Sequence, residues 1–170
     1  SLKERPGFLR LFAGKESPKT KGSFSYVGAR QGSHTFQASI WMDAGSLQEG
    51  EGAGLLLYQN HENHLKMEVK AFKDQNLFSV TEVIQGKEKI LCEQPAEGTS
   101  LEIILRGKDQ KGQVFLDFGR GRSSAAEEIP LWHYTTEAAG GFVGCTIGMF
   151  ASSYGKKSRG WADFGWMSIS

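Results

Sequence analysis

The sequence contains few prolines, few cysteines and no long apolar run. Only 4 of its 170 residues are proline and 2 are cysteine. A chain of this length buries roughly 70% of its unfolded surface, so a core forms without disulfide or metal cross-links. No apolar stretch approaches the roughly 20 residues that cross a bilayer. We therefore expect a single globular domain over residues 1–170, with Cys92 and Cys145 as free thiols, although one bridge between them also fits.

An excess of charge of either sign is also absent. Lys and Arg number 20 against 19 Asp and Glu, which gives a net charge of +1. Nucleic-acid binding needs a concentrated basic surface, so DNA or RNA is not the expected partner. The first 22 residues do carry six basic side chains, but apolar residues alternate with them. This pattern is typical of a solvated strand face: Lys3, Arg5, Arg10, Lys15, Lys19 and Lys21.

Glycine is abundant, at 22 residues, and it separates short stretches with period-two alternation. No segment has a sustained helical period. The pattern predicts eleven strands, at residues 8–12, 24–29, 35–42, 53–59, 64–72, 77–84, 87–92, 101–106, 113–118, 142–151 and 161–169. Many short strands joined by glycine-rich turns indicate an all-β fold, a two-sheet antiparallel β-sandwich.

Three local patterns refine this prediction. Leu65, Met67 and Val69 alternate with charged residues, so they share one strand face that must be covered. Residues 60–63 and 73–76 are rich in Asn and Asp, which favour hairpin turns. The longest stretch without a predicted strand, residues 119–141, is the candidate functional loop.

Motifs in these segments resemble a known family. Pro6-Gly7-Phe8-Leu9-Arg10-Leu11, Ala53-Gly54-Leu55-Leu56-Leu57-Tyr58 with Asn63, and Gly141-Phe142-Val143-Gly144 with Ala162-Asp163-Phe164 occur in order. Together they resemble the C-terminal domain of family 43 glycoside hydrolases, which are β-xylosidases and α-L-arabinofuranosidases. Small residues in these motifs let neighbouring backbone approach closely.

The resemblance implies a concanavalin-like jelly roll that packs on a catalytic five-bladed propeller, which carries the three catalytic carboxylates. Residues 1–170 would then be a domain excised from a longer enzyme, with an apolar patch where its partner covers it. Such sandwiches often hold a structural calcium ion, for which Asp163 is one candidate ligand, against a solvated or hydrogen-bonded acid. No other cofactor is expected.

The chain departs from the family pattern at two places near the expected active-site mouth. Arg30 and Gln31 remain from a longer basic motif. Residues 137–140 lack the aromatic side chain that closes the catalytic pocket in several members. Its role would pass to Trp132, His133 or Tyr134, or else the catalytic partner has a different pocket.

Candidate residues for independent chemistry are sparse. Glycoside hydrolysis needs two carboxylates about 5 to 9.5 Å apart across a cleft. Glu49 and Glu51 lie in a glycine-rich loop and are expected to be solvated, whereas the neighbours Glu127 and Glu128 would point apart. His61 and His64 have the spacing of ligands on a helix but fall in a predicted turn, which argues against zinc.

Sugar binding remains an open alternative, because aromatic faces stack on sugars. The aromatic and imidazole side chains expected on loops are Trp132, His133, Tyr134 and Tyr154. We expect a non-catalytic accessory domain whose partners are a propeller in the same or a companion chain and a plant cell-wall oligosaccharide, with homo-oligomers also allowed. The alternatives are an independent module that binds xylan or arabinoxylan and, less favoured, an enzyme. The compartment, cytoplasmic or periplasmic, stays open.

Overall fold

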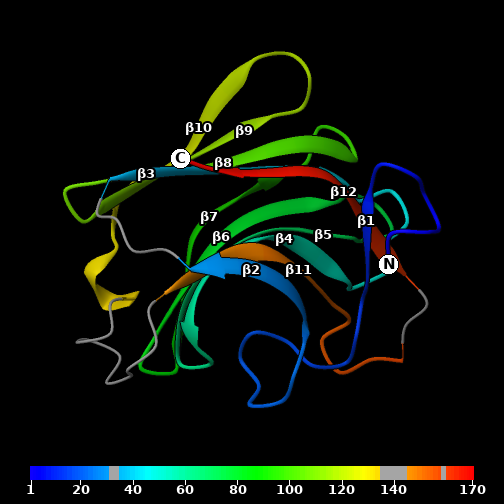
Figure 1. The fold of residues 1–170 in the computed structure, drawn as a ribbon, viewed down its shortest axis with the longest axis horizontal. Helices are drawn as coiled ribbons and strands as arrows, with labels where there is room; N and C mark the ends of the chain where they lie inside the picture. Colours follow the sequence, from blue (N-terminus) through cyan, green and yellow to red (C-terminus); the bar gives the residue numbers. More distant parts are fainter. Residues whose placement is uncertain (31–34, 135–144, 158–159) are drawn as a thin grey trace.

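The computed structural model describes residues 1–30, 35–134, 145–157 and 160–170, which form two stacked six-stranded sheets (Figure 1). Sheet A has, in spatial order, β1 (Leu9–Phe12), β12 (Trp161–Ile169), β3 (Phe36–Asp43), β8 (Ser100–Lys108), β9 (Lys111–Asp117) and β10 (Arg122–Pro130). Sheet B has β2 (Ser25–Arg30), β11 (Thr146–Ser152), β4 (Gly52–Asn60), β5 (Asn63–Lys70), β6 (Leu77–Ile84) and β7 (Lys87–Pro95). Neighbouring strands pair antiparallel, so the predicted all-β sandwich is confirmed.

The core lies between the sheets and follows the period-two pattern of the sequence. Ile40 and Met42 of β3 face Leu65 and Met67 of β5 across it, and all four side chains are fully buried. Val69 lies on the same face of β5, as predicted from the alternation. Alternate residues of each strand therefore meet in one apolar layer.

The predicted close approach of backbone at glycine is confirmed at two positions of sheet B. A Cβ at Gly54 would overlap the carbonyl oxygen of Met67, and a Cβ at Gly148 would overlap that of Val27. Each glycine allows its strand to lie tightly against the neighbouring one, which a larger residue would prevent.

The two predicted turns join consecutive strands. Asn60 pairs with Asn63 across the β4–β5 hairpin, and the Asn60 side chain accepts a hydrogen bond from the backbone N–H of Glu62 at 2.9 Å. Residues 73–76 connect β5 to β6, and the Asn76 side chain accepts from the N–H of Phe72 at 3.2 Å. Both turns use the local side-chain bonding expected of Asn.

One strand was missed by the sequence reasoning. β10 lies within residues 119–141, which were predicted to form a loop, so this prediction was wrong for the part that the strand occupies. The strand has register shifts after Ser124 and Ala126, and Glu128 has a φ of 54°. Its alternation is therefore broken, and as an edge strand it is mostly exposed. Irregular edge strands carry little of the pattern on which prediction depends.

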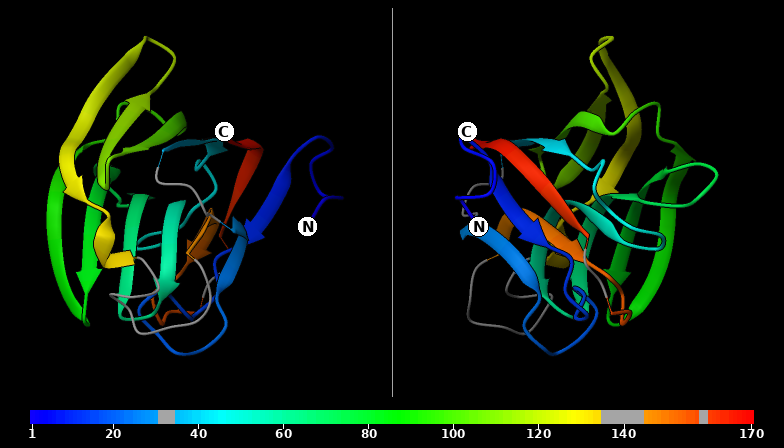
Figure 2. Two further views of the ribbon diagram at one scale, coloured as in Figure 1. Left: turned by 60° about the vertical axis from the view of Figure 1, so that its left-hand side comes forward. Right: turned by 90° about the vertical axis from the view of Figure 1, so that its right-hand side faces the viewer.

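The sandwich has two long edges of different character. At one edge β7 and β10 are the outer strands, and at the other β1 and β2 are. Figure 2 shows the N-terminus, β1 and β2 together along the second edge. Here Ser1 and Arg10 exchange backbone hydrogen bonds, and the N–H of Arg10 donates to the carbonyl of Ser1 at 2.7 Å. The start of the chain is thereby held beside β1.

Two further expectations concern the whole chain. Cys92 and Cys145 are free thiols, in agreement with the favoured alternative. Among the described residues, no helix is long and apolar enough to span a bilayer.

Candidate functional site

Of the predicted mouth residues, Arg30 lies at the end of an edge strand, and Trp132, His133 and Tyr134 form a short segment after β10. Arg30 ends β2, where it pairs with Thr146 of β11, and Thr146 pairs in turn with Tyr58 of β4. The Arg30 side chain is exposed. Gln31 and the Gly141–Gly144 motif lie outside the described residues. Arg30 therefore presents a positive charge at the end of an edge strand.

The short 3₁₀ segment η1 (Trp132–Tyr134) presents the predicted aromatic residues in two different ways. The segment η1 begins shortly after β10 ends at Pro130. The residues before and after Trp132 are fixed by contacts with the rest of the fold. The backbone N–H of Leu131 donates to the carbonyl of Gln110 at 2.8 Å, and the Tyr134 ring is buried in the core with 1% exposure. With both neighbours anchored, Trp132 remains 50% exposed.

Trp132 and His133 together form a small surface. Their ring centroids lie 3.8 Å apart, and His133 is partly buried. Tyr134, by contrast, is a core residue, so the expectation that it is exposed on a loop was wrong. Its hydroxyl has no hydrogen-bond partner among the described residues, and burial raises its pKa. The predicted contact residues of η1 therefore reduce to Trp132 and His133.

Tyr154, the fourth predicted contact residue, belongs to a buried polar network on the outer face of sheet B. Its hydroxyl donates to Glu68 and accepts from the Lys66 ammonium at 2.9 Å. Lys66 and Glu68 also form an ion pair at 3.2 Å, with side-chain exposures of only 5% and 3%. Burial, and next the Glu68 charge, raise the pKa of Tyr154 well above its usual value. The bonds hold this hydroxyl inside the fold, so the expected loop platform for sugar is not formed by Tyr154.

An aromatic cluster lies on the same outer face, near the end of β2. Ring centroids are 5.4 Å apart for Phe24 and Tyr26, 5.3 Å for Phe24 and Tyr58, and 5.9 Å for Tyr58 and His64. His64 is fully buried, and burial lowers its pKa to about 4, partly offset by its contact with the Asn60 carbonyl. The His61 and His64 pair thus comprises one turn residue and one buried neutral side chain.

The segment at residues 13–24 covers this outer face. The hydroxyl of Ser152 donates to the carbonyl of Glu16 at 2.8 Å, and the Lys19 ammonium reaches Glu88 of β7 at 2.7 Å. Ser17 and Pro18 between them are buried. The basic residues of this region were predicted to lie on a solvated strand face. Lys19 is indeed partly exposed, but it belongs to a covering segment and not to a strand, and it pairs with Glu88. The sequence gives no local signal for this cover, because Lys66 occupies a strand position whose alternation predicts exposure to solvent.

Two further acids are held by hydrogen bonds, Glu51 against expectation and Asp163 in agreement with the hydrogen-bonded alternative. Glu51 was expected to be solvated, yet it is only 2% exposed and accepts from the backbone N–H of Gln48 at 2.7 Å. Asp163 is bound by Arg10 at 2.8 and 3.1 Å and by Arg5 at 3.4 Å. Burial alone would raise the pKa of Asp163, but the bonds and charges of Arg10 and then Arg5 lower it.

These contacts decide how well Asp163 fits a calcium ion. Both of its oxygens already accept hydrogen bonds from cationic groups, which oppose a divalent cation electrostatically. In the described part of the chain, no three His, Cys, Asp or Glu side chains gather as metal ligands would. The surroundings of Asp163 therefore do not fit the structural calcium ion for which it was one candidate ligand.

Comparison with known proteins gives a consistent result. The family model that describes the β-xylosidase C-terminal concanavalin A-like domain, GH43_C2, matches residues 1–170. A xylosidase/arabinosidase of Butyrivibrio fibrisolvens is 40% identical over 169 residues, which are 99% of this chain and 33% of that protein. The non-reducing end α-L-arabinofuranosidase BoGH43B of Bacteroides ovatus is 29% identical over 172 residues, at 99% of this chain and 32% of its own length.

A solved structure agrees with these relatives. The GH43 protein BlXynB of Bacillus licheniformis superposes with a TM-score of 0.91 and 26% identity, over 99% of this chain and 34% of that one. The chain thus spans about a third of the length of the relatives it matches. Its two-sheet sandwich and the match over its whole length show that it belongs to the family of concanavalin A-like C-terminal domains of GH43 β-xylosidases.

Proposed function

We propose that this chain is the non-catalytic accessory domain of a family 43 xylosidase or arabinofuranosidase, packed on a catalytic propeller. The observation that carries the proposal is one of length. The family match covers all of residues 1–170, whereas the relatives are about three times longer. The buried acids support it, because Glu68 and Asp163 are engaged by cationic partners and hold the fold together.

The end of the sandwich around Arg30 would shape the mouth of the active site. Arg30 carries an exposed guanidinium, which suits hydrogen bonds to sugar hydroxyls, and Gln31 follows it in the chain. Trp132 with His133 offers an aromatic surface at the same end. A domain of this kind sets substrate preference through such side chains and leaves bond cleavage to its partner.

Truncation of the parent chain tests the accessory role. Three proteins are compared with an aryl xyloside and an aryl arabinofuranoside: the full parent chain, its part before Ser1, and residues 1–170. We expect turnover by the full chain, weaker or unstable activity of the part before Ser1, and none from residues 1–170. Turnover by residues 1–170 that a Glu→Gln change abolishes would show an enzyme instead.

Point variants of the parent chain test the mouth residues. Arg30→Ala and Trp132→Ala should lower kcat/KM about tenfold, the equivalent of about 1.4 kcal/mol of transition-state stabilisation. Arg106→Ala is the matched control for Arg30, because Arg106 is exposed on β8 and bonds Gln37. Equal kcat/KM in all three variants would show that Arg30 and Trp132 do not act at the mouth of the active site.

The exposed Trp132 also supports a second candidate function, that of an independent xylan- or arabinoxylan-binding module, because an exposed aromatic ring can stack on a sugar. Titration calorimetry of residues 1–170 with xylo-oligosaccharides separates the two. We expect no saturable heat. Saturable heat that Trp132→Ala removes would favour the binding module.

A further inference from the structure

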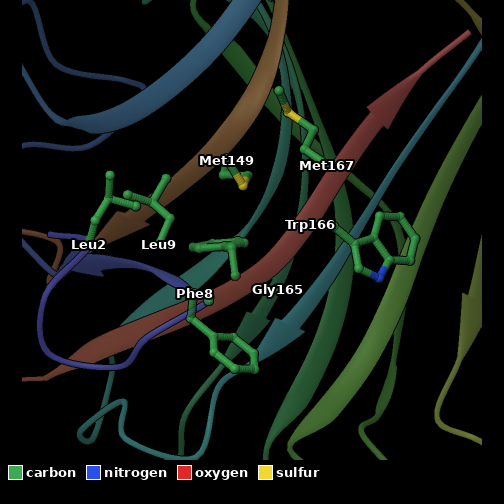
Figure 3. A pocket seen from close by; sticks show the side chains of 9 residues that line it. Leu2, Phe8, Leu9, Met149, Gly165, Trp166 and Met167 are labelled. Atoms are coloured by element: carbon green, nitrogen blue, oxygen red, sulfur yellow. The ribbon is translucent and has the colours of Figure 1, made fainter.

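An apolar hollow lies at the edge where β1 and β2 are the outer strands. Its volume is about 380 Å³, and the side chains that shape it come from the N-terminal segment, β1, β11 and β12 (Figure 3): Leu2, Phe8, Leu9, Met149, Trp166 and Met167. Met149 and Phe164, which also lines it, belong to the core cluster. The hollow is therefore a place where the core reaches the surface.

The hollow stays open because the two edge strands do not close over it. Val27 of β2 pairs with Met149, so both side chains lie on the core side of sheet B, yet Val27 is 42% exposed. Leu2 is 71% exposed and Trp166 43%. These three are among seven large apolar side chains that are exposed in the described residues. Apolar surface that gathers at one edge in this way marks an interaction site.

We propose that this open edge is the docking surface for the catalytic domain of the same chain. The inference rests on the proposed function and adds to it the face that makes the contact. About two thirds of the length of the relatives lies outside the matched region, and the family is a C-terminal domain, so a catalytic domain would precede Ser1. Leu2 lines the hollow, and the backbone bonds between Ser1 and Arg10 hold the start of the chain beside it.

A tethered domain is favoured over a second copy by its effective concentration. A domain that joins the chain at Ser1 has a short path to the hollow and binds intramolecularly, at an effective concentration of about millimolar for a short linker. A second copy has no such advantage. The same edge also includes Arg30, because the Ser25 hydroxyl at the start of β2 donates to the Phe12 carbonyl of β1 and Arg30 ends β2. Docking here would therefore bring Arg30 to the catalytic domain.

Hydrogen exchange of the full parent chain tests the face directly. β2 and β7 are the two edge strands of sheet B and serve as each other's reference. If the catalytic domain covers β2, its outward amides should exchange at least about tenfold more slowly than those of β7, which corresponds to about 1.4 kcal/mol of added protection. Equal exchange, or slower exchange at β7, would overturn the proposal.

Charge substitution in the full parent chain provides the second test. Leu2→Glu places a carboxylate at the hollow, and adding Val27→Glu places a second one beside it. Ile90→Glu is the matched control, because Ile90 is 56% exposed on β7 at the other edge. We expect the hollow variants to lower the sandwich's calorimetric transition by about 3 °C or more and the control to leave it unchanged. Leu2→Glu lies outside the strands, so its effect does not depend on a defect in β2.

The outcomes separate this inference from the proposed function. If wild-type full chain unfolds as two independent units, and removal of residues 1–170 leaves kcat/KM unchanged, the accessory role itself fails. If the wild-type units are coupled but the hollow variants keep that coupling, only the docking face is wrong. A halved mass by light scattering in the hollow variants, with coupling retained, would assign the edge to contacts between copies and would also overturn the proposal.

Discussion

The outer faces of the two sheets contrast with each other. On sheet A, Glu102 of β8 pairs with Arg122 at 3.6 Å, and Arg106 bonds Gln37 at 3.1 Å, with these side chains partly or fully exposed. On sheet B, the equivalent outward positions of β5 hold His64, Lys66 and Glu68, which are at most 4% exposed.

The contrast shows that alternation identifies strand faces but not what covers them. Strand β5 of sheet B alternates apolar with polar residues, and β8 of sheet A does so except at Ile104; in both strands the inward apolar side chains enter the core. Tyr154 and segment 13–24 lie on the outer face of sheet B, so the Lys66–Glu68 ion pair, which would be solvated on an uncovered face, is dehydrated there. Buried pairs respond to substitution very differently from exposed ones.

The largest effect on stability is expected from removing the buried Lys66–Glu68 ion pair, which distinguishes the outer face of sheet B from that of sheet A. Glu68→Ala should lower the free energy of unfolding by about 3 to 5 kcal/mol, because Lys66 is left buried without its counter-charge. Glu102→Ala on sheet A should cost about 1 kcal/mol or less. Urea denaturation measures both, and the double variant Lys66→Met/Glu68→Leu should lose less than Glu68→Ala. Equal losses for Glu68→Ala and Glu102→Ala would contradict the contrast.

A pH-dependent loss of stability should also originate on sheet B. His64 has a pKa of about 4 in the fold against 6.5 when unfolded, so between these values the unfolded chain binds the additional proton. The contribution is complete above pH 6.5 and is lost as pH falls to about 4, by about 3 kcal/mol. His64→Gln should flatten the urea-denaturation profile in that window, whereas His61→Gln, in the turn, should not. An unchanged slope in His64→Gln would show that other groups set it.

Removal of the Tyr154 hydroxyl tests the difference between the two outer faces at a single oxygen atom of sheet B. Tyr154→Phe removes the donor to Glu68 and the acceptor for Lys66 but keeps the ring. We expect a loss of about 1 to 3 kcal/mol in the free energy of unfolding, the cost of buried polar groups without a partner. An unchanged free energy of unfolding would contradict the burial of this network, because it would mean that water takes the place of the hydroxyl.

The smallest effect is expected at the tether of the covering segment. Lys19 and Glu88 retain side-chain exposures of 44% and 38%. Lys19→Ala should therefore change the free energy of unfolding by about 1 kcal/mol or less. A loss as large as that of Glu68→Ala would indicate that this pair alone keeps sheet B covered.

The sequence predicts the regular parts of this fold well. The alternation in β3 and β5 identifies the core faces, the Asn-rich turn identifies the β4–β5 hairpin, and Gly54 identifies a close strand contact. It fails at β10, where register shifts interrupt the alternation. Within the candidate site, the sequence predicts the exposure of Trp132 but does not predict the burial of Tyr134. A single short turn has no periodic pattern that would separate its buried residues from its exposed ones.

What the sequence determines by itself is the all-β architecture and the two faces of the regular strands, since both depend on local periodicity. Only the tertiary structure decides that Lys66 and Glu68 are buried, that Asp163 is bound by two arginines and that β1 and β2 leave the core open at one edge. These features depend on contacts between residues far apart in the chain. No local pattern records which segment will cover a given face.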